Sequence, residues 1–287
     1  WHAWALHPTG GATGLILALF LVGLVGVVLG AVAVGALSTW WRGPPWVAAL
    51  FPLLPGAYWS LRVTVSDALA LGLALAAIAL AARSRHLPAV ALGVLAVLAK
   101  EPTILLFVGW AIHRRTRRDA LLVVVPAAAI VAWMGWLHLQ LPADTDAPHD
   151  LGLPFVGLVH AWTKIWSQGR ELVGMACTLG GIALAVVALA VRRLRHPLGW
   201  AIAVQLGFAS IMGHNPLGAN FGATRMAMAL MILSVLALAT PQAADAQAAH
   251  DAALATDLAA EGVRTSGDPV PEPAHTPQRP SPPRCAH

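Results

Sequence analysis

The sequence contains charge-free stretches that are too long and too apolar for a soluble domain of this size. No Asp, Glu, Lys or Arg precedes Arg42, and residues 15–38 within that stretch are almost unbroken Leu, Val, Gly and Ala. About 20 such residues suffice for a helix to cross the hydrocarbon core of a bilayer. Charged residues make up only 11% of the 287 residues, against roughly 25% in soluble domains. The sequence therefore predicts an all-α, polytopic integral membrane protein, which excludes a soluble enzyme, a disordered protein and a nucleic-acid binder.

Apolar runs separated by charged or turn-forming residues predict nine helical segments. Two of them, residues 89–99 and 103–112, are about half the length of a membrane span, and the segment 46–60 should be kinked because it contains Pro52 and Pro55. The full set is 15–38, 46–60, 68–82, 89–99, 103–112, 120–141, 172–191, 198–213 and 226–240. We therefore expect a helical bundle embedded in a lipid bilayer.

Positive charges gather in three loops, which fixes the predicted orientation. These loops and Arg42 carry ten basic residues, whereas the intervening loops carry four, and cytoplasmic loops are normally the basic ones. The ten are Arg42, Arg83, Arg85, Arg114, Arg115, Arg117, Arg118, Arg192, Arg193 and Arg195, and the four are Arg62, Lys164, Arg170 and Arg225. The composition, rich in Ala, Arg, Val and Gly, favours a bacterial source. We therefore expect a bacterial inner or plasma membrane, with the C-terminal tail in the cytoplasm.

Two regions outside the spans have a distinct composition. In the outer loop 142–171, apolar side chains recur at helical spacing and predict an interfacial amphipathic helix (Phe155, Leu158, Val159, Trp162, Ile165 and Trp166). Residues 241–287 are first rich in Ala and then rich in Pro, a composition that cannot bury a core. The predicted organisation is a transmembrane domain over residues 1–240 and a disordered tail over 241–287.

Charged residues at membrane depth are costly and therefore mark candidate functional positions. Asp67 begins a helix at its outer end, where it is either a helix-terminal residue beside a Ser66 cap or a functional carboxylate. Lys100 and Glu101 precede Pro102 at the tip of the half-length hairpin, whose first helix rises only about 16 Å. They form either a structural ion pair or part of a functional site. Arg225 is predicted at the outer mouth of the last helix, where it would either bind phosphate oxygens or reach toward lipid headgroups.

Metal binding has weaker support. Asp144, Asp146, His149 and Asp150 in the outer loop could supply ligands to a divalent cation, although such loops are more often simply solvated. Cys177 and Cys285 form no CxxC pattern. The residues therefore leave the metal question open.

The spacing of these charged residues resembles that of a known enzyme family. A run from Ser66-Asp67-Ala68-Leu69 through a helix ending at Arg83, then Leu98-Ala99-Lys100-Glu101-Pro102, is similar to the middle of GT-C fold glycosyltransferases. The bacterial relatives of protein O-mannosyltransferases and aminoarabinose transferases resemble it most. The resemblance implies transfer of a sugar, of the hexose (mannose) or pentose class, from a polyprenyl-phosphate carrier to an envelope acceptor on the outer face.

The resemblance also implies roles for individual residues. Asp67 and Glu101 would be the catalytic carboxylates, Lys100 and Arg225 would bind the carrier phosphate, and a divalent cation such as Mg²⁺ or Mn²⁺ could assist. The family's first-loop catalytic Asp has no counterpart before Asp67, so we expect that the chain lacks its first helices or is a divergent member. A secondary transporter or permease and a non-catalytic envelope-assembly subunit remain alternatives. Transporters usually show two similar halves, and no repeat of the Lys100-Glu101 hairpin occurs.

Overall fold

The chain folds into helices joined by short turns. The computed structural model describes residues 12–63, 65–140, 151–213, 217 and 220–241, and within these ranges no strand is present. The longer helices are α2 (Ala12–Trp40), α5 (Asp67–Ala82), α6 (His86–Ala99), α7 (Ile104–Arg114), α8 (Arg117–Gln140), α10 (Leu172–Arg192), α11 (Gly199–Ser210) and α13 (Asn220–Ala239). Shorter ones are α3 (Leu50–Leu53), α4 (Pro55–Arg62) and α9 (Val156–Lys164), with 3₁₀ turns η1 (Pro45–Ala49), η2 (Glu101–Thr103), η3 (Trp166–Gln168) and η4 (Arg193–Arg195). The all-α class is confirmed.

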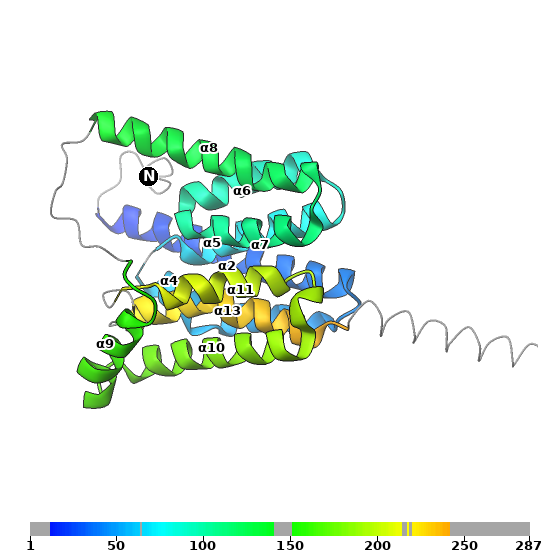
Figure 1. Cartoon of the computed structure of the whole chain (residues 1–287). Coiled ribbons are helices and arrows are strands. Elements are labelled where there is room, and N and C mark those ends of the chain that lie inside the picture. Colours follow the sequence, from blue (N-terminus) through cyan, green and yellow to red (C-terminus); the bar gives the residue numbers. More distant parts are fainter. Residues whose placement is uncertain (1–11, 64, 141–150, 214–216, 218–219, 242–287) are drawn as a thin grey trace, which may run out of the picture. The chain divides into compact units, whose positions relative to one another are not determined.

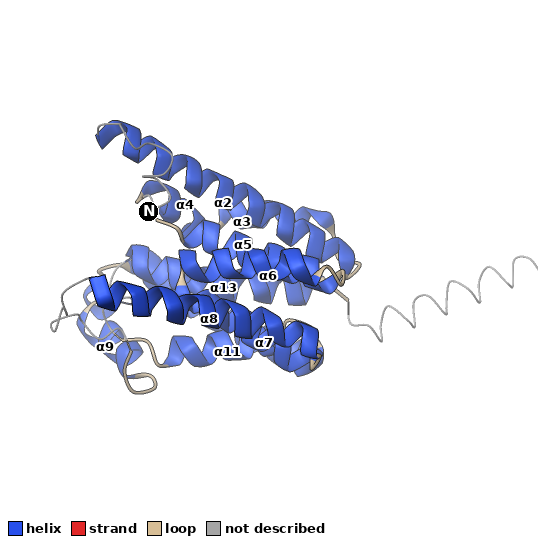
Figure 2. Cartoon of the chain, turned by 90° about the horizontal axis from the view of Figure 1, so that it is seen from above, coloured by secondary structure: helices blue, strands red, loops and turns tan. Residues whose placement is uncertain are grey.

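Four of the described helices are long and apolar enough to cross a membrane: Gly14–Trp40, Arg117–Gln140, Leu172–Arg195 and Gly222–Ala239. In both Figure 1 and Figure 2 the long helices run side by side along a common direction. Large apolar side chains on α8 are exposed, with Val131 at 70% and Leu139 at 84%. Because faces of this kind are stable only in an apolar surrounding, the helices indicate a membrane protein in contact with lipid.

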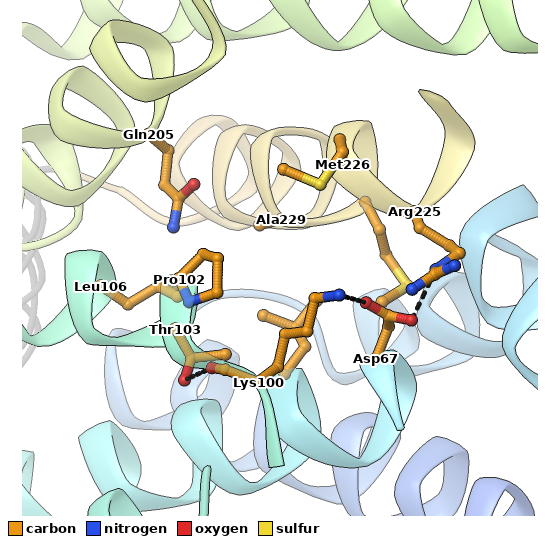
Figure 3. A pocket seen from close by; sticks show the side chains of 11 residues that line it. Asp67, Lys100, Pro102, Thr103, Leu106, Gln205, Arg225, Met226 and Ala229 are labelled. Carbon is orange, nitrogen blue, oxygen red and sulfur yellow. Dashed lines mark hydrogen bonds and ion pairs between the residues drawn. The ribbon is translucent and has the colours of Figure 1, made fainter. Parts of the chain in front are cut away.

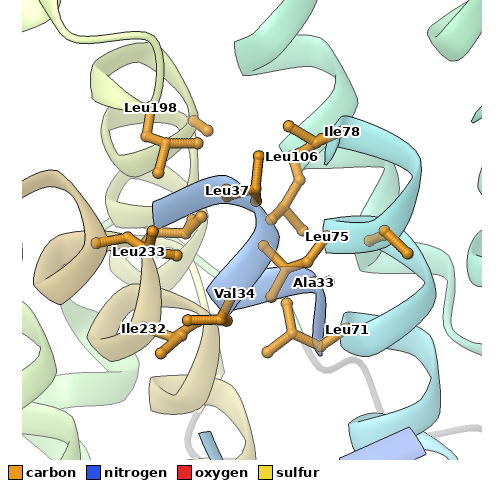
Figure 4. Packing of buried hydrophobic residues seen from close by; sticks show 14 of the residues in the cluster. Ala33, Val34, Leu37, Leu71, Leu75, Ile78, Leu106, Leu198, Ile232 and Leu233 are labelled. Atoms are coloured by element: carbon orange, nitrogen blue, oxygen red, sulfur yellow. The ribbon is translucent and has the colours of Figure 1, made fainter. Parts of the chain in front are cut away.

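Helix α5 is the most enclosed element. All but three of its sixteen residues are buried, and it packs between α2 and α6. Small residues permit this contact, since a Cβ on Gly26 of α2 would lie 2.4 Å from the Cα of Leu69. The core continues through Val34 and Leu37 of α2 to α13 (Figure 4). Helix α5 is thus held rigidly, and its first residue, Asp67, has a fixed position.

The predicted breaks and boundaries agree closely with the structure in most places. The segment 46–60 is divided into η1, α3 and α4, with Leu54 extended before Pro55. The half-length helices are separate, because α6 ends at Ala99 and α7 begins at Ile104. The last helix differs, since it begins at Asn220 instead of residue 226. Arg225 therefore lies inside α13 and not at its mouth.

The amphipathic segment forms α9, which crosses the direction of the long helices in Figure 1. Its small residues face the protein: a Cβ on Gly157 would lie 2.0 Å from the carbonyl oxygen of Met212. Phe155, Val159 and Trp162 are more than half exposed on the other side. The predicted division at residue 240 stays a prediction, because the proposed disordered tail lies outside the described residues beyond Pro241.

Candidate functional site

Asp67 occupies the first position of α5, and Ser66 does not act as the helix cap that the sequence suggested. The Ser66 side chain makes no cap hydrogen bond; its Oγ instead donates to the Ala99 carbonyl oxygen at 2.8 Å. This bond ties the beginning of α5 to the end of α6. The Asp67 carboxylate is left to meet cations from two other elements, although the residue is only 8% exposed.

Lys100 is presented by the turn between α6 and α7. Its backbone is extended (φ −159°, ψ 112°), so the helix stops at Ala99. The Lys100 carbonyl oxygen accepts hydrogen bonds from the Thr103 hydroxyl at 2.7 Å and from the Thr103 backbone N–H at 3.1 Å. With the turn fixed in this way, the Lys100 Nζ lies 3.6 Å from Oδ1 of Asp67 (Figure 3).

Arg225 reaches the same carboxylate from α13. Its Nε lies 2.5 Å from Oδ2 of Asp67, an ion pair without the alignment of a hydrogen bond. The Arg225 side chain is 14% exposed, that of Lys100 34%. Two cations beside one carboxylate leave this cluster, Asp67–Lys100–Arg225, with a net charge of +1. Each of these cations can also attract an anionic ligand, in competition with the carboxylate.

Glu101 does not join the cluster. It is exposed, and it lines a groove that Lys100 and Arg225 also line. The extended backbone at Lys100 and the turn η2 that begins at Glu101 divide the two adjacent residues between the end of α6 and the turn. Of the four residues singled out in the sequence, the structure thus brings three into direct contact and places the fourth beside them.

Two hollows meet at the cluster. An inner pocket of about 50 Å³ is lined by Asp67, Lys100 and Arg225 together with apolar residues of α7 and α13 and Gln205 of α11 (Figure 3). A larger groove of about 590 Å³ is lined by Lys100, Glu101 and Arg225 and by apolar residues of α2, α6 and α8 (Leu19, Val22, Leu98 and Trp133). Lys100 and Arg225 therefore stand between a mostly apolar groove and a smaller pocket.

The candidate metal ligands cannot be placed. Asp144, Asp146, His149 and Asp150 lie outside the described residues. Within the described part of the chain, no group of three or more His, Cys, Asp or Glu residues could hold a metal ion.

Sequence reasoning missed several buried polar residues. Gln205 of α11 and Thr178 of α10 are 6% exposed, in helices that otherwise read as uniformly apolar. At the opposite ends of the helices, Asp119 is fully buried, where its carboxylate accepts hydrogen bonds from the Trp110 Nε1–H at 2.9 Å and from the Thr116 hydroxyl. The only sequence signal for Thr178 and Gln205 was a polar residue within an apolar run.

His196 is a further buried polar residue that the sequence did not single out. Its Nε2 lies 2.9 Å from the Thr240 hydroxyl, and its Nδ1 accepts the Leu198 backbone N–H. Since Nδ1 accepts, the ring is neutral with its proton on Nε2. Burial, and secondarily the nearby Arg192 charge, lower the pKa of His196 to about 4. His196 and Asp119 lie far along the helices from the cluster and hold loops in place.

Comparisons with protein families, with curated proteins and with solved structures give no match for this chain. The function must therefore be argued from the cluster and its two hollows.

Proposed function

We propose that the protein is a membrane glycosyltransferase that takes a sugar from a polyprenyl-phosphate carrier and transfers it to an envelope acceptor on the outer face. The observation that carries the proposal is the cluster itself. Lys100 and Arg225 come from distant segments, meet at one carboxylate and line a mostly apolar groove. A polyprenyl phosphate has the same combination, an anionic group at one end of a long apolar chain.

The groove suits the isoprenoid chain of such a carrier. Its walls on α2, α6 and α8 are apolar, and the exposed apolar faces of α2 and α8 indicate contact with lipid. A chain that entered from the bilayer would lie against Leu19, Val22 and Leu98, with its phosphate at Lys100 and Arg225. Arg suits the phosphate because its planar guanidinium can donate two parallel hydrogen bonds to phosphate oxygens.

Phosphate binding should weaken the ion pairs of Asp67. Each cation that turns to the carrier phosphate weakens its contact with the carboxylate, so the carrier and Asp67 compete for the same charges. In the proposed reaction the acceptor hydroxyl oxygen attacks the anomeric carbon, the bond from that carbon to the phosphate oxygen breaks, and the polyprenyl phosphate leaves with the electron pair. Lys100 and Arg225 stabilise the charge that develops on the leaving oxygen.

A carboxylate must take the proton of the acceptor hydroxyl. Glu101 is the better candidate for this step, because it is exposed in the groove beside Lys100 whereas Asp67 is already paired with two cations. Asp67 is proposed to position both cations and to orient the acceptor. The proposal includes a divalent cation only as an optional addition to the site, bound by the carboxylates of Asp67 and Glu101.

The proposed orientation follows the distribution of basic residues. The cluster lies at the Asp67 end of α5, and the basic loops lie at the other end, beyond Arg83 and Arg114. In a bacterial inner membrane this orientation places the cluster toward the outside and the tail in the cytoplasm. The orientation can be tested with a cysteine introduced at Ala147. We expect a membrane-impermeant maleimide added from outside to label this cysteine. Labelling only after the membrane is opened would show that the orientation is the reverse.

The transfer activity can be tested in membranes that contain the protein. Polyprenyl-phosphate carriers loaded with tritiated mannose or tritiated arabinose are supplied, and label in the acceptor fraction is measured per amount of protein. We expect Lys100→Ala and Arg225→Ala to raise the KM for the carrier, and Asp67→Asn and Glu101→Gln to lower kcat. Lys164→Ala, which removes an exposed lysine from α9, is the matched control and should transfer at the parent rate.

Two results would overturn the proposal. One is the absence of transfer from either loaded carrier by the parent protein. The other is transfer at the parent rate by all four variants of the cluster and of Glu101. In either case a permease, which would also hold charges beside a broken helix, becomes the better explanation.

A further inference from the structure

Four turns at one end of the helices carry exposed arginines, and contacts join these turns into one surface (right-hand end of Figure 1). The Arg83 guanidinium donates to the carbonyl oxygen of Ala36, near the end of α2, at 3.0 Å. The Trp41 ring contacts the Trp110 ring of α7 and the His196 ring, with centroids 6.5 Å and 5.5 Å apart. We call this surface the basic end, and its exposed arginines are Arg42, Arg85, Arg114, Arg115, Arg117, Arg118, Arg193 and Arg195.

Most of these charges have no carboxylate to balance them. Asp119 is the acidic residue that the described part of the chain has at this end, and it is fully buried. Its Oδ2 lies 3.7 Å from Nε of Arg114. The other exposed arginines of the basic end, which make no ion pair with a described residue, therefore leave a concentrated positive charge on the surface.

Three of these arginines have a backbone conformation that disfavours any residue with a Cβ. The φ angle is 59° at Arg42, 52° at Arg115 and 55° at Arg193. Glycine adopts such angles without the steric cost, and many helices end on a glycine for this reason. The turns themselves would therefore be better served by glycine, which points to a use of the three arginine side chains outside the fold.

Two further arginines are unfavourably placed in their own helix. Arg117 and Arg118 lie in the first turn of α8, where the helix dipole disfavours positive charge. Both side chains are exposed. An anion bound in front of this turn would offset the unfavourable charge, so α8 also favours a negatively charged ligand at the basic end.

Exposed apolar side chains lie among the arginines and indicate which anion is bound. Trp40 is 50% exposed, Leu87 84% and Leu194 39%, and each lies within two residues of an exposed arginine. The headgroup layer of a bilayer offers phosphate groups beside acyl chains, and tryptophan is typical of that depth. A soluble acidic protein would supply negative charge but no hydrocarbon for a side chain such as Leu87.

We propose that the basic end binds the phosphate groups of anionic phospholipids, with Arg42, Arg115 and Arg193 presented to the headgroup layer at the cost of backbone strain. The ligand class is a phosphodiester headgroup with a net negative charge, of which phosphatidylglycerol is the probe. Phosphatidylcholine, whose choline balances its phosphate, should bind more weakly. This inference does not depend on the proposed function, because it concerns the ends of the helices away from Asp67.

The test measures lipid preference on the full chain in detergent micelles. Phosphatidylglycerol or phosphatidylcholine is titrated in, bound lipids are resolved by native mass spectrometry, and the ratio of the two dissociation constants gives the preference. The parent protein should prefer phosphatidylglycerol, and the preference should fall as salt is added. The triple variant Arg42→Gly, Arg115→Gly, Arg193→Gly should lower the preference by at least about five-fold, the effect of roughly one arginine at a membrane surface.

Two controls separate charge from backbone shape. Ser84 is exposed, has a φ of 60° and lies at the basic end, but it carries no charge. Ser84→Gly should therefore leave the lipid preference unchanged, and the triple variant with lysine at positions 42, 115 and 193 should keep most of it. In nanodiscs of phosphatidylcholine alone, both glycine variants should melt at a higher temperature than the parent protein, because the strain is relieved.

Several results would overturn the proposal. One is equal affinity of the parent protein for the two lipids, or an undiminished preference in the triple glycine variant. Another is loss of the preference in Ser84→Gly, since the shape of the turns and not their charge would then decide. Melting of the triple glycine variant below the parent in phosphatidylcholine would show that the arginines serve the fold. A parent protein without lipid preference that binds polyglutamate would assign the basic end to an acidic protein partner instead.

Discussion

The two ion pairs of Asp67 should contribute very unequally to stability. The perturbation is removal of each charge alone and in pairs: Asp67→Ala, Lys100→Ala, Arg225→Ala and the two double variants that contain Asp67→Ala. The Arg225 pair is close and mostly buried, at 2.5 Å with a 14% exposed arginine. The Lys100 pair is longer, at 3.6 Å, and its lysine is 34% exposed.

These geometries set the expected magnitudes. Removing one partner of a buried pair costs about 3–5 kcal/mol because a charge is left unpaired, whereas exposed pairs contribute about 0.2–1 kcal/mol. Residual exposure of Arg225 reduces the first figure, so we expect a coupling of about 2–4 kcal/mol between Asp67 and Arg225. The coupling between Asp67 and Lys100 should stay below about 1 kcal/mol.

The assay is reversible unfolding of the purified protein in mixed micelles, followed by tryptophan fluorescence as the denaturing detergent is increased. Double-mutant cycles then give each coupling free energy. Lys164→Ala is the control for removal of a lysine charge. Equal couplings, or a larger coupling for Lys100, would refute the assignment of Arg225 as the principal partner of Asp67.

Three further predictions concern the rest of the fold. Burial lowers the pKa of His196 to about 4, so this histidine stabilises the folded state fully above pH 6.5. The contribution is lost as the pH falls from 6.5 toward 4. Melting temperatures should therefore fall over that range by the equivalent of up to about 3 kcal/mol, and should fall less in a His196→Asn variant. Asp119→Ala should lower the free energy of unfolding by about 2–3 kcal/mol, because it leaves the buried Trp110 N–H unpaired, as chemical denaturation can measure. Gly109→Val should destabilise the protein strongly, or prevent its accumulation in membranes as measured by immunoblotting, because even a Cβ at Gly109 would lie 2.3 Å from the Cα of Ala201.

The elements that sequence predicted well are those whose ends are marked by charge or proline. Helix α5 was bounded by Asp67 and Arg83, and the break after Ala99 was marked by a charged pair before Pro102. The free-energy cost of burying a charge and the missing N–H of proline both act locally, so both effects can be recognised in the sequence. The convergence of Asp67, Lys100 and Arg225 on one side followed from counting spans, and the structure brings these three together.

Other features depend on contacts between distant segments and could not be predicted. The first turn of α13 has the sequence Asn-Phe-Gly-Ala-Thr, which lacks a continuous apolar stripe, so Arg225 was placed in a loop. Ser66 was expected to cap its own helix, but its partner is a carbonyl 33 residues away. Adjacent positions suggested that Lys100 and Glu101 could form a structural ion pair, whereas the structure pairs Lys100 with Asp67.

The carrier site at Lys100 and Arg225 is tested most directly by a binding comparison in lipid nanodiscs. Polyprenyl phosphate and the uncharged polyprenol of the same chain length are titrated against the parent protein and against Arg225→Ala. The predicted result is saturable binding of the phosphate, much weaker binding of the alcohol, and loss of that difference in the variant. Equal affinity of the parent protein for the phosphate and the alcohol, or undiminished preference for the phosphate in Arg225→Ala, would contradict it.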